Sequence, residues 1–110
     1  MAESPRGRLC ILVLQWTARS VTDYEDLIAM EEQLLAELPQ EHGTLDGHDF
    51  GSGEMNIFVY TLRPLEAFED VVRSLGSWAR WADARAAYRP LDSDDFVILW
   101  PATLGQFAVS

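Results

Sequence analysis

Two strand-length segments, residues 9–14 and 55–61, carry large side chains on both of their faces. The first reads Leu-Cys-Ile-Leu-Val-Leu and the second Met-Asn-Ile-Phe-Val-Tyr-Thr. Successive side chains of a strand point to opposite faces of its sheet. A strand that is apolar on both faces must be covered on both, so we expect these two segments in the centre of a sheet.

Two helices are predicted around a central hairpin. Residues 22–25, Thr-Asp-Tyr-Glu, have the pattern of a capping box, in which the Thr22 side chain caps the helix and Glu25 reaches back to the cap. We therefore expect a helix over residues 22–38, which ends before a proline. A second helix over residues 64–75 has a proline in its first turn, where proline is tolerated.

The remaining extended segments form a hairpin and one further strand. The hairpin comprises residues 43–50 and 54–61, joined by the Gly-Ser-Gly turn at 51–53. Its first arm is polar enough for an edge strand. Residues 96–100, Phe-Val-Ile-Leu-Trp, form the last strand, and residues 85–90 also have extended character.

The order strand, helix, two strands, helix, strand predicts an α+β fold, the ferredoxin-like split βαβ sandwich. Its antiparallel sheet has the strand order 4-1-3-2 and both helices on one face, with an extra strand near residues 85–90 as an option. We expect residues 1–110 to form a single domain in which residues 1–7 are a flexible arm. The other sheet face should be covered by the C-terminal tail, by residues 78–88 or by a second subunit.

The charge is unevenly distributed along the chain. The net charge is −10, every base is arginine, and residues 23–54 carry ten acidic residues and no Lys or Arg. Phosphate binding needs a basic surface, so this balance argues against a nucleic-acid partner. The acidic block either keeps the chain soluble or forms a surface that meets a basic protein partner.

Cys10 is the single cysteine, so no internal disulfide can form. Within its apolar segment it is expected to be a small buried hydrophobe, and the alternative is a reactive thiol. The absence of a disulfide framework and of a signal peptide predicts a cytoplasmic location. The apolar run 9–14 is too short to span a membrane.

Candidate catalytic residues concentrate on the hairpin. Asp46 and His48 are two residues apart on a strand, so we expect their side chains on the same side. A carboxylate beside an imidazole can fix the tautomer that a general base needs, with Asp49 or Glu54 acting from the facing arm. The alternative is a solvated hairpin in which these residues serve turn chemistry.

A metal site is a further alternative, because this region is rich in side chains that bind metals. They are His42, Asp46, His48, Asp49 and Glu54. The spacing fits no EF-hand, HExxH or CxxC motif, and the glycines match no phosphate-binding loop. We therefore expect neither a metal nor another cofactor.

Four residues outside the hairpin are candidates for a binding surface. Glu31 falls within the apolar stripe of the first helix, where a carboxylate must find a partner or reach water. Trp78, Trp81 and Arg89 are suited to line a pocket or an interface, and the alternative is that they pack at the edge of the core.

Residues 46–58, with the downstream segments 87–89 and 96–101, resemble a family of small uncharacterised bacterial proteins. The resemblance covers roughly residues 40–101 and implies no catalytic residue. In size and charge alone, the chain is also similar to the immunity proteins that neutralise bacterial toxins.

The sequence therefore predicts a non-enzymatic binding module that engages a protein partner through the acidic segment 41–54, of which an immunity-type inhibitor is one form. The alternative is a small enzyme or ligand-binding protein that uses His48 and Asp46. A third hypothesis is a homodimer that closes its open sheet face over a small ligand.

Overall fold

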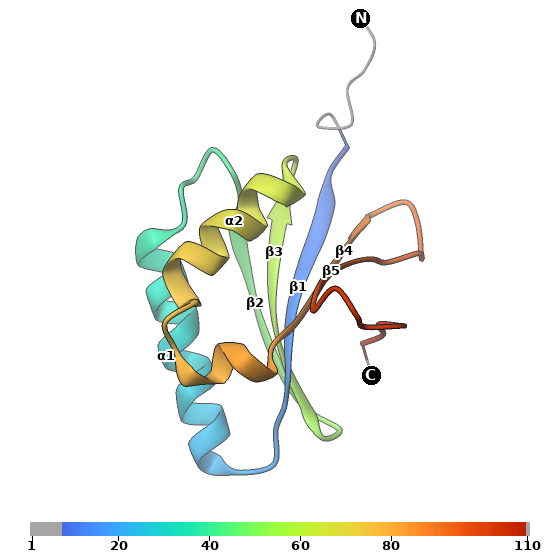
Figure 1. Cartoon of the computed structure of the whole chain (residues 1–110). Helices are drawn as coiled ribbons and strands as arrows, with labels where there is room; N and C mark the ends of the chain where they lie inside the picture. The colour runs from blue at the N-terminus through green and yellow to red at the C-terminus, as the bar shows by residue number, and fades with distance from the viewer. Residues whose placement is uncertain (1–7, 110) are drawn as a thin grey trace, which may run out of the picture.

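The computed structural model describes residues 8–109 and consists of two α-helices and a five-stranded sheet (Figure 1). The predicted arm, residues 1–7, lies outside the described residues. The elements follow one another as β1 (Cys10–Thr17), α1 (Val21–Glu37), β2 (Thr44–Gly51), β3 (Glu54–Thr61), α2 (Pro64–Leu75), a 3-10 helix (Ala79–Asp83), β4 (Arg85–Pro90) and β5 (Val97–Trp100). The predicted α+β class is confirmed.

The sheet is antiparallel throughout and has the strand order β2-β3-β1-β4-β5. β1 and β3 are inner strands and β2 is an edge strand, as their apolar and polar patterns predict. β4 pairs with β1, and β5 lies outside β4 at the other edge. The four-stranded ferredoxin-like arrangement is therefore not confirmed.

The place beside β1 is taken by residues 85–90, which the sequence offers only as an optional strand. Ala86 and Ala87 of β4 are fully buried: the small Ala86 side chain lies in the core under the helices, and that of Ala87 lies on the opposite face beside Val13. Val97 and Trp100 of β5 remain exposed, as the edge position allows. The strand with the stronger apolar pattern is thus the outer one.

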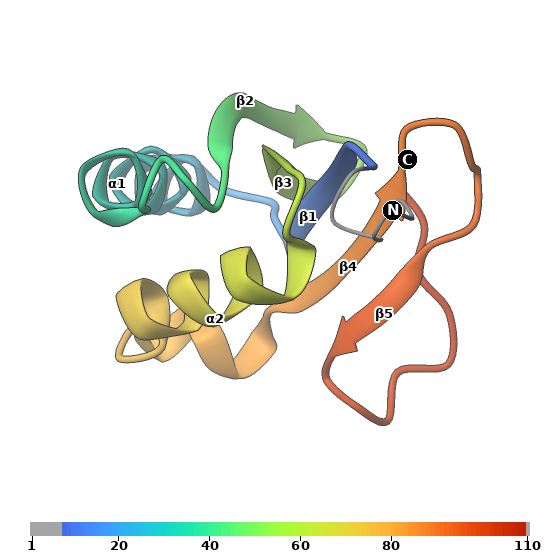
Figure 2. The same cartoon turned by 90° about the horizontal axis from the view of Figure 1, so that it is seen from above.

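Both helices pack on one face of the sheet (Figure 2). Alternate residues of β1 and β3 point towards the helices, and the apolar face of each helix packs against them. The core between the two layers contains Leu12, Leu14, Trp16, Leu27, Met30, Leu34, Met55, Ile57, Val59, Val71 and Leu75.

The opposite face of the sheet is covered in its centre by the end of the C-terminal tail, residues 107–109 (Figure 2). The Gln15 side-chain amide donates a hydrogen bond of 3.0 Å to the Ala108 carbonyl. The Phe107 ring packs on Phe96 with their centroids 4.9 Å apart. Of the three covers expected from the sequence, the tail is the one that lies there.

The N-cap of helix α1 lies two residues earlier than the sequence pattern predicts. Its N-cap is Ser20, whose hydroxyl accepts from the Asp23 amide at 3.1 Å, while the Asp23 carboxylate accepts from the Ser20 amide. The predicted box of Thr22 and Glu25 is wrong. Asp can take the place of Glu at the third helical position, and this earlier box also ties Arg19 to Asp23.

Replacing Ser20 with alanine is expected to lower the free energy of unfolding by about 1 kcal/mol, because the Asp23 amide loses its acceptor. Thr22→Ala is the matched control: Thr22 is exposed in the first turn, and alanine is the better helix former. Urea unfolding of both variants tests the assignment. A loss at Thr22 and none at Ser20 would contradict it.

Candidate functional site

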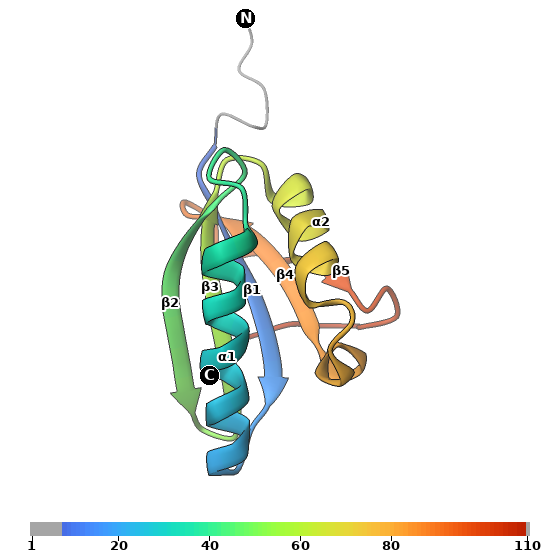
Figure 3. The ribbon, with the colours of Figure 1, turned by 90° about the vertical axis from the view of Figure 1, so that its left-hand side faces the viewer.

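The contact between His48 of β2 and Glu31 of α1 joins two of the predicted site residues. His48 Nδ1 lies 2.9 Å from Glu31 Oε1, and the two side chains are 30% and 20% exposed. Glu31 therefore finds a partner at the rim of the apolar stripe, as its position requires. In Figure 3, α1 runs beside β2 and brings these residues within reach of each other.

A β-bulge decides which side chains of β2 face the helix. Leu45 pairs with Val59 and Gly47 pairs with Phe58, so Asp46 is an extra residue in the strand. The alternation shifts at this point, and Leu45 and His48 both lie on the helix side. The simple alternation that the sequence predicts is therefore wrong across Asp46, and the carboxylate in contact with His48 is that of Glu31.

An exposed aromatic pair, Tyr24 and Phe50, lies next to the histidine, with Tyr24 in contact with it. The Tyr24 ring meets His48 edge-on at a centroid distance of 6.1 Å and meets Phe50 edge-on at 5.4 Å. Tyr24 is 42% exposed and Phe50 37% exposed, so these aromatic groups belong to the surface. Tyr24 follows the periodicity of the apolar stripe of α1, which would place it in the core, yet its ring lies at the surface.

Acidic side chains lie next to this aromatic group. Glu31, Glu32 and Asp46 line a shallow hollow of about 280 Å³ together with the exposed Leu35. A second hollow of about 330 Å³, also lined by Leu35, continues along the junction of α1 and β2. We call the group Tyr24, Glu31, Glu32, Leu35, Asp46, His48 and Phe50 the α1–β2 surface.

Arginine neutralises only the beginning of α1. Arg80 forms ion pairs with Asp23 at 2.6 Å and with Asp26 at 2.7 Å. Hydrogen bonds from the Arg19 amide and the Arg80 guanidinium hold the pKa of Asp23 well below its usual range. Among residues 8–109, no ion pair involves Glu32 or Asp46, so the α1–β2 surface keeps its negative charge.

Asp49 and Glu54 lie on a different face from His48. Asp49 pairs with Asn56, whose side chain is on the sheet face opposite the helices. Glu54 accepts a hydrogen bond from Gln15 at 3.3 Å on that same face. The catalytic arrangement that the sequence suggests, His48 and Asp46 with Asp49 or Glu54, is not brought together.

Trp78, Trp81 and Arg89 lie away from the α1–β2 surface. The Trp78 indole donates to Gln33 at 3.1 Å, and Trp81 packs near Phe68. Both tryptophans are partly buried and pack against the edge of the core. The Arg89 guanidinium donates to the Ser93 carbonyl at 3.0 Å and lies over the Phe96 ring. Arg89 thus orders the connection between β4 and β5.

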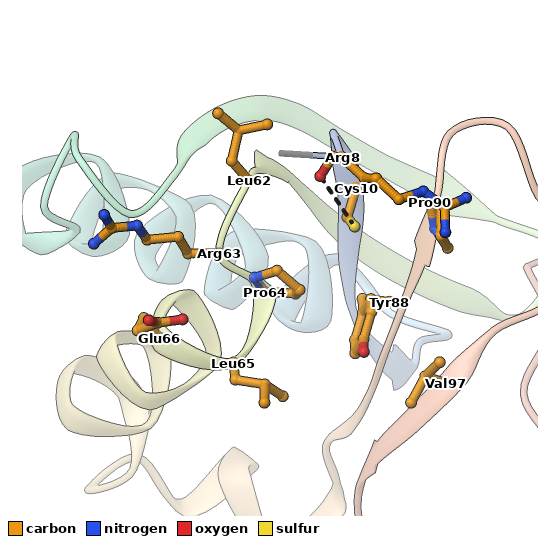
Figure 4. A pocket seen from close by; sticks show the side chains of 10 residues that line it. All are labelled: Arg8, Cys10, Leu62, Arg63, Pro64, Leu65, Glu66, Tyr88, Pro90 and Val97. Atoms are coloured by element: carbon orange, nitrogen blue, oxygen red, sulfur yellow. Dashed lines mark hydrogen bonds between the residues drawn. The ribbon is translucent and has the colours of Figure 1, made fainter. Parts of the chain in front are cut away.

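A larger hollow of about 520 Å³ lies where β1 and α2 begin, beside β4 and β5 (Figure 4). Its walls are mainly apolar, with Pro64, Leu65, Tyr88 and Val97 around the opening. Cys10 lies on its floor, and burial raises the pKa of the thiol. A protonated thiol is a poor nucleophile, so Cys10 acts as a small apolar residue there.

A second histidine–carboxylate contact joins the loop after α1 to α2. His42 Nδ1 lies 2.5 Å from the buried Asp70, which also accepts from Arg73 at 2.7 Å. Sequence reasoning missed Asp70, because nothing near it in the chain marks it as a partner of His42. Within the described residues, no group of three His, Cys, Asp or Glu side chains is suited to hold a metal ion.

Comparisons with protein-family models, with curated proteins and with solved structures find no match to this chain. The resemblance to a bacterial family therefore stays a prediction. No helix in the described part of the chain has the length and apolar character needed to cross a membrane.

Proposed function

We propose that this chain is a small acidic binding module that engages a basic protein partner through the α1–β2 surface, without a catalytic step of its own. The observation that carries the proposal is the combination of unneutralised carboxylates with exposed apolar and aromatic side chains on that surface. Aromatic anchors surrounded by polar residues are typical of surfaces that bind proteins.

Charge complementarity supports a basic partner. Glu32 and Asp46 lie on either side of the hollow at Leu35, and no Lys or Arg occurs between residues 20 and 62. A positively charged partner is attracted to such a surface, and a negatively charged one is repelled. An immunity-type inhibitor of a basic toxin, acting in the cytoplasm, is one concrete form of this function.

We expect a synthetic peptide of about 15 residues, rich in Arg and Leu, to bind the chain about tenfold more weakly at 300 mM than at 50 mM salt. The double variant Glu32→Gln, Asp46→Asn should weaken binding at low salt and flatten this dependence, because it removes the two exposed carboxylates. Fluorescence anisotropy of the labelled peptide measures both effects.

The matched control is Asp94→Asn, Asp95→Asn, which changes the net charge equally in the exposed loop before β5. If both double variants weaken binding to the same extent, the peptide responds to net charge alone and the proposed surface is wrong. A preference for the α1–β2 surface requires the first pair to have the larger effect.

A further inference from the structure

We propose that Glu31, Tyr24 and Phe50 form a binding site for a guanidinium or ammonium group, and that His48 occupies this site until a cation of the partner replaces it. This inference rests on the proposed function, since it names the group of the basic partner that the α1–β2 surface recognises. It also predicts how pH regulates that recognition.

The chemistry of a cation site is present in the side chains around Glu31. The Glu31 side chain is four-fifths buried, so a charge-assisted hydrogen bond to it is screened less than at an open surface. The exposed Tyr24 ring meets His48, the residue that contacts Glu31, and the exposed Phe50 ring meets Tyr24; aromatic faces attract guanidinium and ammonium groups. A carboxylate beside aromatic rings is suited to an arginine or lysine side chain.

His48 acts as an internal substitute for that cation. Its Nδ1 is 2.9 Å from Glu31, and its ring forms an edge-to-face pair with Tyr24, with the centroids 6.1 Å apart. When protonated, the imidazole forms an ion pair with Glu31, and when neutral it donates only a hydrogen bond through Nδ1. A permanently charged guanidinium therefore competes better with neutral His48 than with protonated His48.

The other groups around His48 do not reverse this dependence. α1 contributes Glu31 and Tyr24, with Glu32 at the adjoining hollow, and β2 contributes Asp46. β3 places the apolar Ile57 opposite it. Histidine is the residue type whose charge ordinarily changes near neutral pH, whereas carboxylic acids and phenols ordinarily change charge outside that range.

Two small probes test the site: the peptide acetyl-Gly-Arg-Gly-amide and its citrulline analogue, in which a neutral urea group replaces the guanidinium. Titrations followed by the ring signals of Tyr24 and His48 in NMR spectra give the affinities. We expect the arginine peptide to bind weakly, with a dissociation constant on the order of millimolar, and the citrulline peptide to bind at least about fivefold more weakly. Equal affinities would overturn the proposal.

Glu31→Gln should weaken the arginine peptide about fivefold or more, because a charge-assisted hydrogen bond is lost. Glu32→Gln is the matched control, since it removes the same charge from the next residue of the helix. The same spectra show whether each variant is folded. If the two variants weaken binding equally, Glu31 is not the anchor.

His48→Gln separates this site from general charge attraction. In the wild-type protein, binding should strengthen several-fold from about pH 5.5 to about pH 8, and in the variant this difference should disappear while binding persists. A pH difference that survives in His48→Gln would refute the role of the histidine. If Glu32→Gln, Asp46→Asn weakens the longer basic peptide and Glu31→Gln adds nothing, the proposed function stands and this site fails.

Discussion

Replacing Trp16 with alanine is expected to lower the free energy of unfolding by about 3–5 kcal/mol. The side chain is 1% exposed and fills the core between the sheet and the helices. Its indole also donates a hydrogen bond of 3.0 Å to the carbonyl of Arg80, which ties β1 to the 3-10 helix. Removing it leaves a cavity and an acceptor without its donor.

The loss is a large part of the total stability of a domain, which is typically about 5–15 kcal/mol. Trp100→Ala is the matched control, because Trp100 lies on the edge strand β5 and is 38% exposed. Trp16→Phe isolates the hydrogen bond and should cost about 1–2 kcal/mol. Urea unfolding compares all three variants, and an equal loss at Trp16 and Trp100 would contradict the assigned core.

Ending the chain after Ala102 is expected to lower the free energy of unfolding by about 2–3 kcal/mol and to make the protein self-associate. Val13 and Asn56 of the central strands are almost completely buried on this face: Val13 lines a hollow with Val109, and the Gln15 amide donates both to Asn56 and to the Ala108 carbonyl. Phe107 and Val109 of the tail are themselves half-buried against this face. Their removal exposes an apolar sheet face that a second copy can cover.

Light scattering over a range of protein concentrations measures the association, and urea unfolding measures the stability. The matched control replaces Thr103 and Gln106, two exposed tail residues, with alanine and should leave both properties unchanged. A truncated chain that remains monomeric and equally stable would show that the tail does not protect the sheet.

The tail also affects the homodimer hypothesis. The open sheet face that was expected to close over a second subunit carries the C-terminal segment of the same chain, held by the hydrogen bond from Gln15 to Ala108. A dimer formed through the centre of this face must first displace the tail. If the full-length chain proves to be dimeric, its interface is expected elsewhere on the molecule.

Local patterns were sufficient to predict most of the secondary structure. The large side chains on both faces of β1 and β3 predicted two inner strands, and the glycine-rich turn predicted the hairpin. In that turn Ser52 and Gly53 both adopt positive φ angles, of 57° and 81°, which suits a tight connection between antiparallel strands. These features depend on neighbours in the chain, so periodicity and turn chemistry reveal them.

Local patterns alone did not decide between two pairs of competing signals. Thr22 with Glu25 and Ser20 with Asp23 both resemble capping pairs, and the chain uses the second. Likewise, residues 85–90 and 96–100 both have extended character, and their order in the sheet depends on which one fits beside β1. The small side chains of Ala86 and Ala87 favour the first, because packing on both faces limits their volume.

The candidate site arises from contacts between distant parts of the chain. Glu31 and His48 were each identified as residues that lack a structural role, yet their pairing depends on how α1 packs against β2. The bulge at Asp46 changes which side chains face the helix, and an extra residue in a strand leaves no clear mark in a polar sequence. Residue types and periodicity thus identified the acidic edge hairpin, whereas helix packing and the strand register determined which of its side chains meet.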